Sequence, residues 1–196
     1  GGNYVYFTAG GGAWRVEIET QREEELVNFA SATRGAGMVG AGMGTTSVST
    51  DDRYWAVPVR VRKDQMRLAV IDTGTGKWEF IAEHSSIGHP QFHPDDSSLL
   101  RFAGPWHSRI WVTRRDGTDM RLLYKRKTAA DGRHYQWIVH EVWRPGSREI
   151  ITADWPHGCI GIDADTAETR TVCTFNAWHP SINDQGTQMC TDTNFP

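Results

Sequence analysis

Three histidines occupy the same place in a repeated sequence pattern. The segments that begin at His89, His140 and His179 align without gaps with one another and with a segment that begins at Thr45. Imidazole is the commonest metal ligand in proteins, and neutral imidazole is a common general base. If the fold brings these histidines together, they could hold a divalent cation, whereas any one alone is better explained as a structural group bonded to a neighbouring element.

Other polar residues extend this set of candidates. Alternate residues of a strand share a face, which adds Gln91 and Ser181, each two residues after one of the histidines. Asn176 precedes His179 by three residues and could reach the same place from a loop. A separate stretch, GPWHSR, carries His107 in a predicted loop, where a Trp-His pair beside an arginine suits a site for a sugar acid.

The elements that position these residues follow from the repeat itself, whose spacing is roughly 40 to 50 residues. Each copy has a short alternating segment, a turn rich in Asp, Gly, Ser and Pro, and a β-rich run, and a third and a fourth run follow in the complete copies. The later runs include residues 54–57, 149–152, 67–71, 109–112, 159–162 and 78–81. Four antiparallel strands per copy predict an all-β fold, a β-propeller whose first strands line a central channel.

We expect residues 1–196 to form a single partial propeller domain of about four blades, with copies starting near Thr45, His89, His140 and His179. Residues 2–7 fit the second strand of an earlier blade and residues 190–192 that of a later one. Both ends therefore fall inside blades, as expected for an internal part of a longer protein. Residues 35–40 match the dinucleotide fingerprint G-x-G-x-x-G, but a strand start follows instead of a helix, which indicates a connection between blades.

Composition narrows the functional classes. A formal net charge of −3 and a pI near 6.2 give no electrostatic basis for binding nucleic acid. The short basic clusters 114–115 and 125–127 are expected to be solvated turns. No apolar run reaches the roughly 20 residues of a membrane helix. Three cysteines, without metal-ligand spacing, are expected to be buried strand thiols. Four remaining histidines, His84, His93, His134 and His157, are assigned to turns or surfaces.

Several motifs resemble known proteins. The segments FHPDD from Phe92 and WRPGS from Trp143 resemble the core of the TolB-like propeller repeat, F-S-P-D-G. More specific are GPWH and the RIW that follows it, HEVW from His140, and the Trp178-His179 pair. In this order they resemble oligogalacturonate lyase, the pectate lyase family built on a seven-bladed propeller, over most of residues 45–196.

The resemblance implies a divalent-metal enzyme, usually a manganese enzyme, that splits oligogalacturonides by β-elimination in the bacterial cytoplasm. The chain opens with Gly-Gly and no methionine, which leaves a periplasmic location open. His140 and His179 match the metal-ligand positions, and Asn176 stands where a ligand glutamine is expected. His107 is the expected base.

Arg109 and Trp106 are the residues expected to bind substrate. The chain departs from the family at Phe102 and Ala103, where the family has His-Glu, and at Ser181, where another ligand histidine is expected.

Two alternatives remain at this stage. The first is a non-catalytic TolB-like propeller that binds protein or glycan at the channel mouth, as those departures suggest. The second is a propeller hydrolase, for which no nucleophile with a paired base stands out. A shared metal would need imidazole nitrogens of His140 and His179 roughly 3–4 Å apart, whereas rings on opposite faces favour the binding protein.

Overall fold

The structure, a computed structural model, describes residues 2–32, 40–41, 45–133 and 136–193. The fingerprint-like stretch 35–40, apart from its last residue, and His134 lie outside these residues. Antiparallel strands dominate the described part, and most pair with their neighbours in sequence. The only helix found there, α1 (Phe29–Ala32), falls well short of the length and apolar content that crossing a membrane requires.

Five sheets follow one another along the described residues. The first contains β1 (Tyr4–Ala9), β2 (Gly12–Glu17) and β3 (Glu23–Asn28). The second contains β4 (Gly40–Ala41) and β5 (Ser47–Val48), both paired with β6 (Tyr54–Arg62), then β7 (Gln65–Asp72) and β8 (Trp78–His84). The third contains β9 (Gly88–His93), β10 (Asp96–Ala103), β11 (Ile110–Arg114) and β12 (Arg121–Tyr124). The fourth contains β13 (Trp137–Trp143), β14 (Glu149–Trp155), β15 (Gly158–Asp163) and β16 (Thr169–Cys173), and the fifth β17 (Ser181–Ile182) and β18 (Met189–Cys190).

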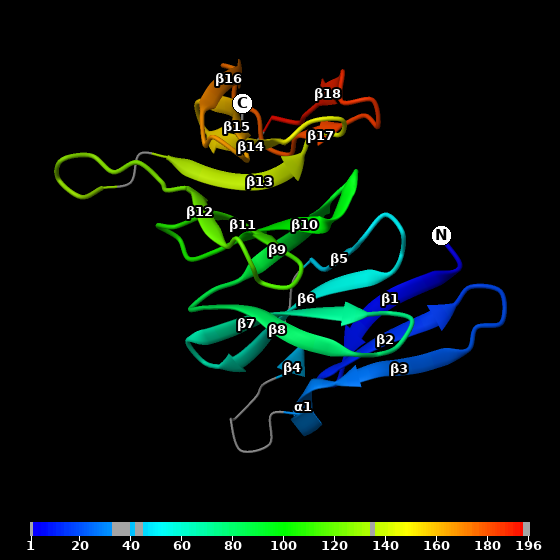
Figure 1. Ribbon diagram of the computed structural model, residues 1–196. Coiled ribbons are helices and arrows are strands. Elements are labelled where there is room, and N and C mark those ends of the chain that lie inside the picture. The colour runs from blue at the N-terminus through cyan, green and yellow to red at the C-terminus, as the bar shows by residue number, and fades with distance from the viewer. Residues whose placement is uncertain (1, 33–39, 42–44, 134–135, 194–196) are drawn as a thin grey trace.

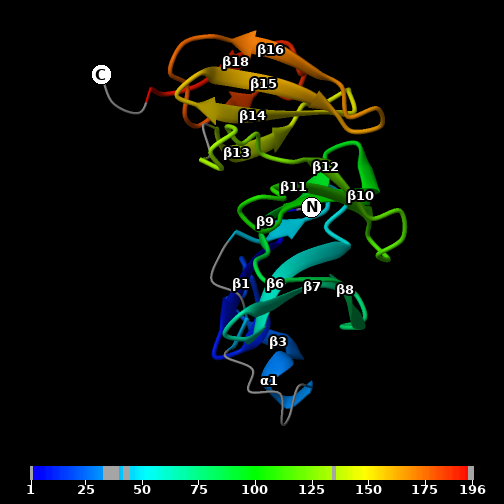
Figure 2. The same ribbon diagram turned by 90° about the vertical axis from the view of Figure 1, so that its left-hand side faces the viewer.

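The sheets succeed one another in chain order, from the blue N-terminal sheet to the orange and red C-terminal ones (Figures 1 and 2). The predicted β-rich runs fall on strands, including 54–57 in β6, 67–71 in β7 and 78–81 in β8, and the run 109–112 starts one residue before β11. The four-stranded antiparallel sheets confirm the predicted all-β fold class.

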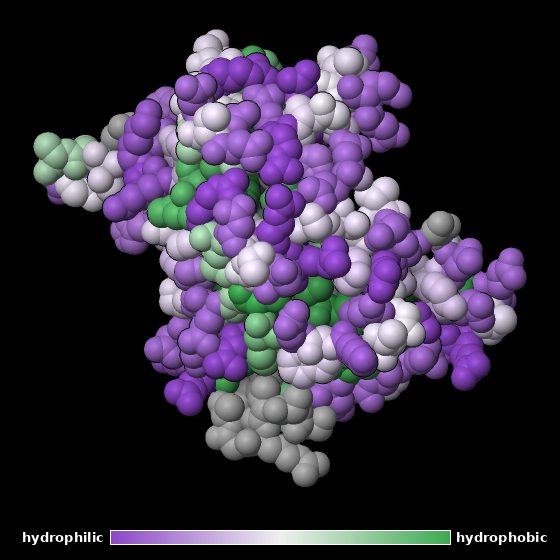
Figure 3. All heavy atoms as spheres, viewed as in Figure 1, coloured by the Kyte–Doolittle hydropathy of each residue, from purple (hydrophilic) through white to green (hydrophobic). Residues whose placement is uncertain are grey.

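The core lies between successive sheets because neighbouring residues of a strand point to opposite faces. In β10, Leu99 packs in a cluster with Ile138 of the fourth sheet, whereas Leu100 packs in a cluster with Leu68 of the second. All four are at most 1% exposed, and burial of such a side chain contributes about 1.5–3 kcal/mol. On the face seen in Figure 3, hydrophobic residues show mainly in bands between sheets, while polar residues cover most of the rest.

His93 links two blades and is buried, contrary to its assignment to a turn or a surface. It ends β9, is 4% exposed, and packs its ring 4.8 Å from that of Trp143. The backbone N–H of Asp95 donates to its Nδ1 at 3.1 Å, so Nε2 carries the proton and donates to the carbonyl oxygen of Ser147 at 2.8 Å. The turn between the first two strands thus holds a buried histidine because the next blade covers it.

The other minor predictions have mixed outcomes. His84 is half-buried in β8, with its ring 4.4 Å from that of Trp111, whereas His157 is exposed in a turn. Cys159 is buried as predicted, but Cys190 is exposed. The prediction of a solvated turn is wrong for Arg126, which is 3% exposed.

Candidate functional site

The histidines that open the third and fourth sheets have an unusual backbone. His89 and His140 have φ values of 47° and 56°, in the left-handed region that residues other than glycine seldom adopt. The pairing of β9 with β10 shifts register beside His89, and that of β13 with β14 shifts between Val139 and Val142. Such bulges bend a strand and redirect its side chains. A repeated backbone irregularity therefore orients the two histidines in the same way.

Both histidines line one cavity of about 330 Å³, together with His179. His89 lies on the third sheet, His140 on the fourth, and His179 in the loop before the fifth, so the predicted convergence of repeat-equivalent histidines is confirmed by the cavity's lining. Gln91, predicted from strand alternation, lines the same cavity. The remaining lining residues are Thr45, Thr46, Ser47, Pro90, Arg101, Glu141 and Pro180.

His140 and His179 lie directly against each other. Their ring centroids are 4.3 Å apart at an interplanar angle of 59°, and the edge of Trp178 packs on His140 at 4.7 Å. Burial lowers the pKa of His140, and the neighbouring His179 lowers it further. The two imidazoles therefore adjoin in the same cavity, and His140 is neutral at neutral pH.

His89 is the third imidazole of the cavity. Its Nδ1 lies 3.2 Å from the hydroxyl of Thr45, the residue that holds the equivalent position in the preceding copy. Burial lowers the pKa of His89, and Arg109 and Arg101 add to the effect against the opposing influence of Glu141. A neutral imidazole of this kind can accept a proton or donate an electron pair to a metal.

Asp192 holds His179 at two points. One carboxylate oxygen accepts a hydrogen bond from the backbone N–H of His179 at 2.8 Å. The other carboxylate oxygen lies 2.8 Å from Nδ1 of the same residue. A carboxylate on one ring nitrogen fixes the tautomer and leaves the opposite nitrogen, Nε2, as the free electron pair. Sequence reasoning missed Asp192 because it lies 13 residues away and becomes a neighbour only through the hairpin of β17 and β18.

Glu141 is buried between two arginines beside the histidines. Its side chain is 1% exposed, with Oε1 2.6 Å from Nε of Arg109 and Oε2 3.5 Å from Nη1 of Arg101. Burial opposes ionisation of this carboxyl, but Arg109 and Arg101 outweigh it and hold the pKa of Glu141 below its usual value. Burial lowers the pKa of Arg101 to about 10, so this guanidinium stays charged at neutral pH.

A third guanidinium, that of Arg126, shares this environment. Burial lowers the pKa of Arg126 to about 10, Arg109 contributes in the same direction, and Glu141 opposes the shift. Within the described residues, Glu141 is the only carboxylate that forms an ion pair with Arg101 or Arg109, and Arg126 forms none. The cluster therefore carries about two excess positive charges, which attract an anionic ligand to this end of the sheets.

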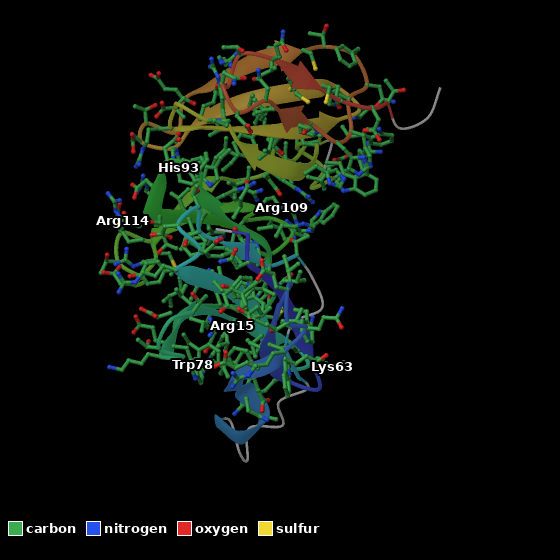
Figure 4. All side chains as sticks on the ribbon, turned by 90° about the vertical axis from the view of Figure 1, so that its right-hand side faces the viewer. Arg15, Lys63, Trp78, His93, Arg109 and Arg114 are labelled. Atoms are coloured by element: carbon green, nitrogen blue, oxygen red, sulfur yellow. The ribbon has the colours of Figure 1, made fainter. Side chains whose placement is uncertain are left out.

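The residues predicted in and after the GPWH motif take three different environments. Arg109 is engaged by Glu141 rather than presented alone to a ligand, and it marks the rim opposite to that of His93 and Arg114 (Figure 4). Trp106 is 46% exposed and His107 is exposed, both in the loop between β10 and β11. His107 is not among the residues lining the histidine cavity.

Asn176, the third predicted metal ligand, and the residues that depart from the oligogalacturonate lyase pattern lie in different surroundings. Asn176 is half-buried in the loop before β17 and lies outside the cavity lining. Ser181 is exposed on β17. Phe102 and Ala103 are buried in the core, at 0% and 2% exposure, so an ionic His-Glu pair at these positions would be incompatible with this packing.

The donor set fits a divalent cation only in part. His140 and His179 offer an adjoining pair of imidazoles, but no group of three or more His, Cys, Asp or Glu side chains in the described part of the chain is arranged to hold a metal. The amide oxygen of Gln91 is already engaged by Arg101 and by the backbone N–H of Trp143, each at 3.1 Å. Two positions of a coordination sphere are therefore available, and further ligands must come from elsewhere.

Solved structures similar to this chain are β-propellers. An oligogalacturonate lyase in complex with manganese matches 98% of this chain and 56% of its own, with a TM-score of 0.78 and 22% identity. The oligogalacturonate lyase of Vibrio parahaemolyticus matches 95% of this chain and 55% of its own, with a TM-score of 0.72 and 20% identity. TolB from Acinetobacter baumannii matches 96% of this chain and 45% of its own, with a TM-score of 0.59 and 12% identity.

These similarities confirm the propeller fold. The chain spans little more than half the length of either lyase. No family model matches the sequence, and no curated protein sequence matches it. At identities of 22% and below, the comparisons establish architecture and leave activity to the residues of the site.

Proposed function

We propose that the protein is a propeller lyase that cleaves acidic oligosaccharides, oligogalacturonides in particular, by β-elimination. The observation that carries the proposal is the meeting of three histidines with Arg101 and Glu141 at one cavity, where Glu141 also pairs with Arg109. Similarity to two oligogalacturonate lyases supports it. A uronide brings a carboxylate, which the excess positive charge attracts, and an α-proton, which a neutral imidazole can remove.

The reaction needs a base and stabilisation of the charge that develops next to the substrate carboxylate. The base takes the C5 proton, the electron pair forms the C4–C5 double bond, and the C4–O bond breaks with the leaving oxygen taking up a proton. The resemblance favours His107 as the base, whereas the cavity favours His89, which lines it and has a lowered pKa.

We further propose that His140 and His179 hold a divalent cation, Mn²⁺ in particular; Asn176, outside the cavity lining, would have to turn toward them to serve as the further ligand that the resemblance implies. One of the similar lyases is a manganese complex. A bound divalent cation would polarise the substrate carboxylate as a Lewis acid. The Asp192 carboxylate orients His179 for this task, and the neutral state of His140 suits a ligand.

The deciding experiment incubates the protein with oligogalacturonides and Mn²⁺ and follows the ultraviolet absorbance of the unsaturated product. The variants His89→Ala and His107→Ala separate the two candidate bases, because only loss of the true base abolishes product formation while Mn²⁺ binding survives. Absence of unsaturated product with every uronide at saturating Mn²⁺ would overturn the lyase proposal.

A second function, a non-catalytic propeller that binds a glycan or protein, is favoured by specific residues. Phe102 and Ala103 are core residues where the family has His-Glu, and Ser181 stands where the family has a ligand histidine. This alternative predicts calorimetric binding of uronides with no product absorbance. The same set of samples therefore distinguishes the two functions.

A further inference from the structure

Four tryptophans form an aromatic patch beside the histidine cavity. Trp137, the first residue of β13, is at its centre, with ring centroids 6.1 Å from Trp106, 5.5 Å from Trp155 and 5.5 Å from Trp178. Trp178 in turn packs on the ring of His140. The patch is therefore continuous with the cavity that holds the three histidines.

Two of these rings are exposed to a degree that is unusual for tryptophan. Trp106 is 46% and Trp137 is 41% exposed, while the other two are half-buried. Trp137 belongs to the fourth sheet, which already packs against the third sheet on one face and the fifth on the other. Adjacent exposed aromatic rings of this kind mark a surface that a ligand contacts.

A buried cation lies beneath the patch. The guanidinium carbon of Arg126 is 3.4 Å from the ring centroid of Trp106, and Nη2 donates to the carbonyl oxygen of Ile138 at 2.5 Å. Its Nε and Nη1 are buried without a hydrogen-bond partner among the described residues. Because Arg126 occupies the inner face of Trp106, only the outer face and edges of that ring are available to a ligand.

The charge of this region selects among ligands that stack on tryptophan. Arg126 adds to Arg101 and Arg109, so three guanidiniums stand against the carboxylate of Glu141 and that of Asp154, which lies opposite Ile138 on β14. An apolar protein segment or a neutral sugar would gain nothing from this excess, whereas a sugar that carries a carboxylate would be attracted to it. A pyranose ring with a carboxylate therefore satisfies both the exposed aromatic faces and the charge.

We propose that Trp106 and Trp137 form a subsite for a uronate ring of the substrate other than the one that reacts, with Arg126 providing attraction for its carboxylate. This subsite rests on the proposed function, since it places a longer uronide across the patch and the histidine cavity. It predicts that chain length matters: a trigalacturonate reaches the patch, and a digalacturonate held at the cavity reaches less of it.

The test measures binding by calorimetry with the full-length protein in the presence of EDTA, so that metal-loaded catalysis plays no part. The probes are digalacturonate, trigalacturonate and a neutral trisaccharide, maltotriose. Trp106→Ala and Trp137→Ala should each weaken trigalacturonate binding about tenfold, the value expected for loss of one stacked aromatic ring. They should change digalacturonate binding much less. Ile18→Ala, which truncates a 53% exposed apolar residue in the turn after β2, is the matched control and should bind as the unmodified protein does.

The role of charge is tested by Arg126→Met and Arg126→Lys. The first should reduce the preference for trigalacturonate over maltotriose, and the second, which keeps the charge, should retain most of that preference. Urea unfolding of both variants separates a lost subsite from a lost fold, and Arg126→Lys keeps the test decisive if Arg126→Met does not fold.

Each negative result excludes a different proposal. Equal binding of trigalacturonate by the tryptophan variants and the unmodified protein overturns the subsite and leaves the lyase proposal standing. The same result with a lower unfolding midpoint shows that another segment covers the rings, which also overturns the subsite. Length-dependent binding that the tryptophan variants lose, without any unsaturated product in the Mn²⁺ assay, overturns the lyase and keeps the subsite. Absence of uronide binding both in EDTA and with Mn²⁺, together with absence of unsaturated product, overturns both.

Discussion

Replacing Glu141 with glutamine should be among the most destabilising isosteric changes in this protein. The side chain keeps its size, so packing is unaltered, but the guanidiniums of Arg101 and Arg109, 4% and 15% exposed, lose their only carboxylate partner among the described residues. Removal of one partner from a buried ion pair costs about 3–5 kcal/mol because a charge is left buried and uncompensated. Arg126 nearby increases the imbalance.

The assay is urea unfolding followed by tryptophan fluorescence. With a urea dependence of about 1–3 kcal/mol per molar, a loss of 3–5 kcal/mol lowers the midpoint on the order of 1–2 M or more. The control is Glu83→Gln, whose carboxylate contacts Nε of Arg67 at 2.6 Å, the same distance as the Glu141–Arg109 contact. Those two side chains are 47% and 39% exposed, so their charges are solvated with or without each other and the midpoint should hardly move.

The pH dependence provides a second readout of the same pair. The pKa of Glu141 in the folded protein lies below the ordinary glutamate value of 4.5, so its contribution is fully present above pH 4.5. The contribution is lost as the pH falls through the folded-state pKa, because the protonated carboxyl no longer balances the arginines. The difference in unfolding free energy between the unmodified protein and Glu141→Gln should therefore shrink on acidification. Equal midpoint losses for Glu141→Gln and Glu83→Gln, or a difference that does not depend on pH, would refute the reasoning.

Three further predictions concern separate parts of the molecule. His93→Ala should lower the unfolding free energy by about 2–3 kcal/mol, because a hydrogen bond between blades and buried packing are lost together; unchanged urea unfolding would contradict this. Asp192→Asn should weaken Mn²⁺ binding about 10- to 100-fold in calorimetry, because the carboxylate fixes the ring of His179, while the urea midpoint stays nearly constant, because the carboxylate is exposed. Undiminished affinity would show that no metal is bound through His179. Gly158→Ala should lower the unfolding free energy by more than about 1–3 kcal/mol in the same assay, because φ is 126° and a Cβ would overlap the carbonyl oxygen of residue 173. A variant as stable as the unmodified protein would be inconsistent with this turn.

The fold could be predicted from sequence because it is encoded locally and repeatedly. Alternation in strands such as β7 and β10, and turns such as those at residues 94–95 and 145–147, specify paired strands within each copy. The repeat then supplies the register between copies, which is why His89, His140 and His179 could be expected to converge. Period-two alternation also identified Gln91 as a neighbour in the cavity.

Tertiary structure alone decided the charges and partners of the site. Glu141 could be read as part of a motif, but its burial between arginines of the preceding sheet depends on how two sheets face each other. Arg126 appeared as one residue of a short basic cluster, and only the packing of Trp106 over it makes it a buried cation. Asp192 becomes a partner of His179 through a hairpin. Strand patterns follow from the properties of consecutive residues, whereas desolvation and ion pairing depend on residues that are distant in sequence, and these determine what the histidine cavity can bind.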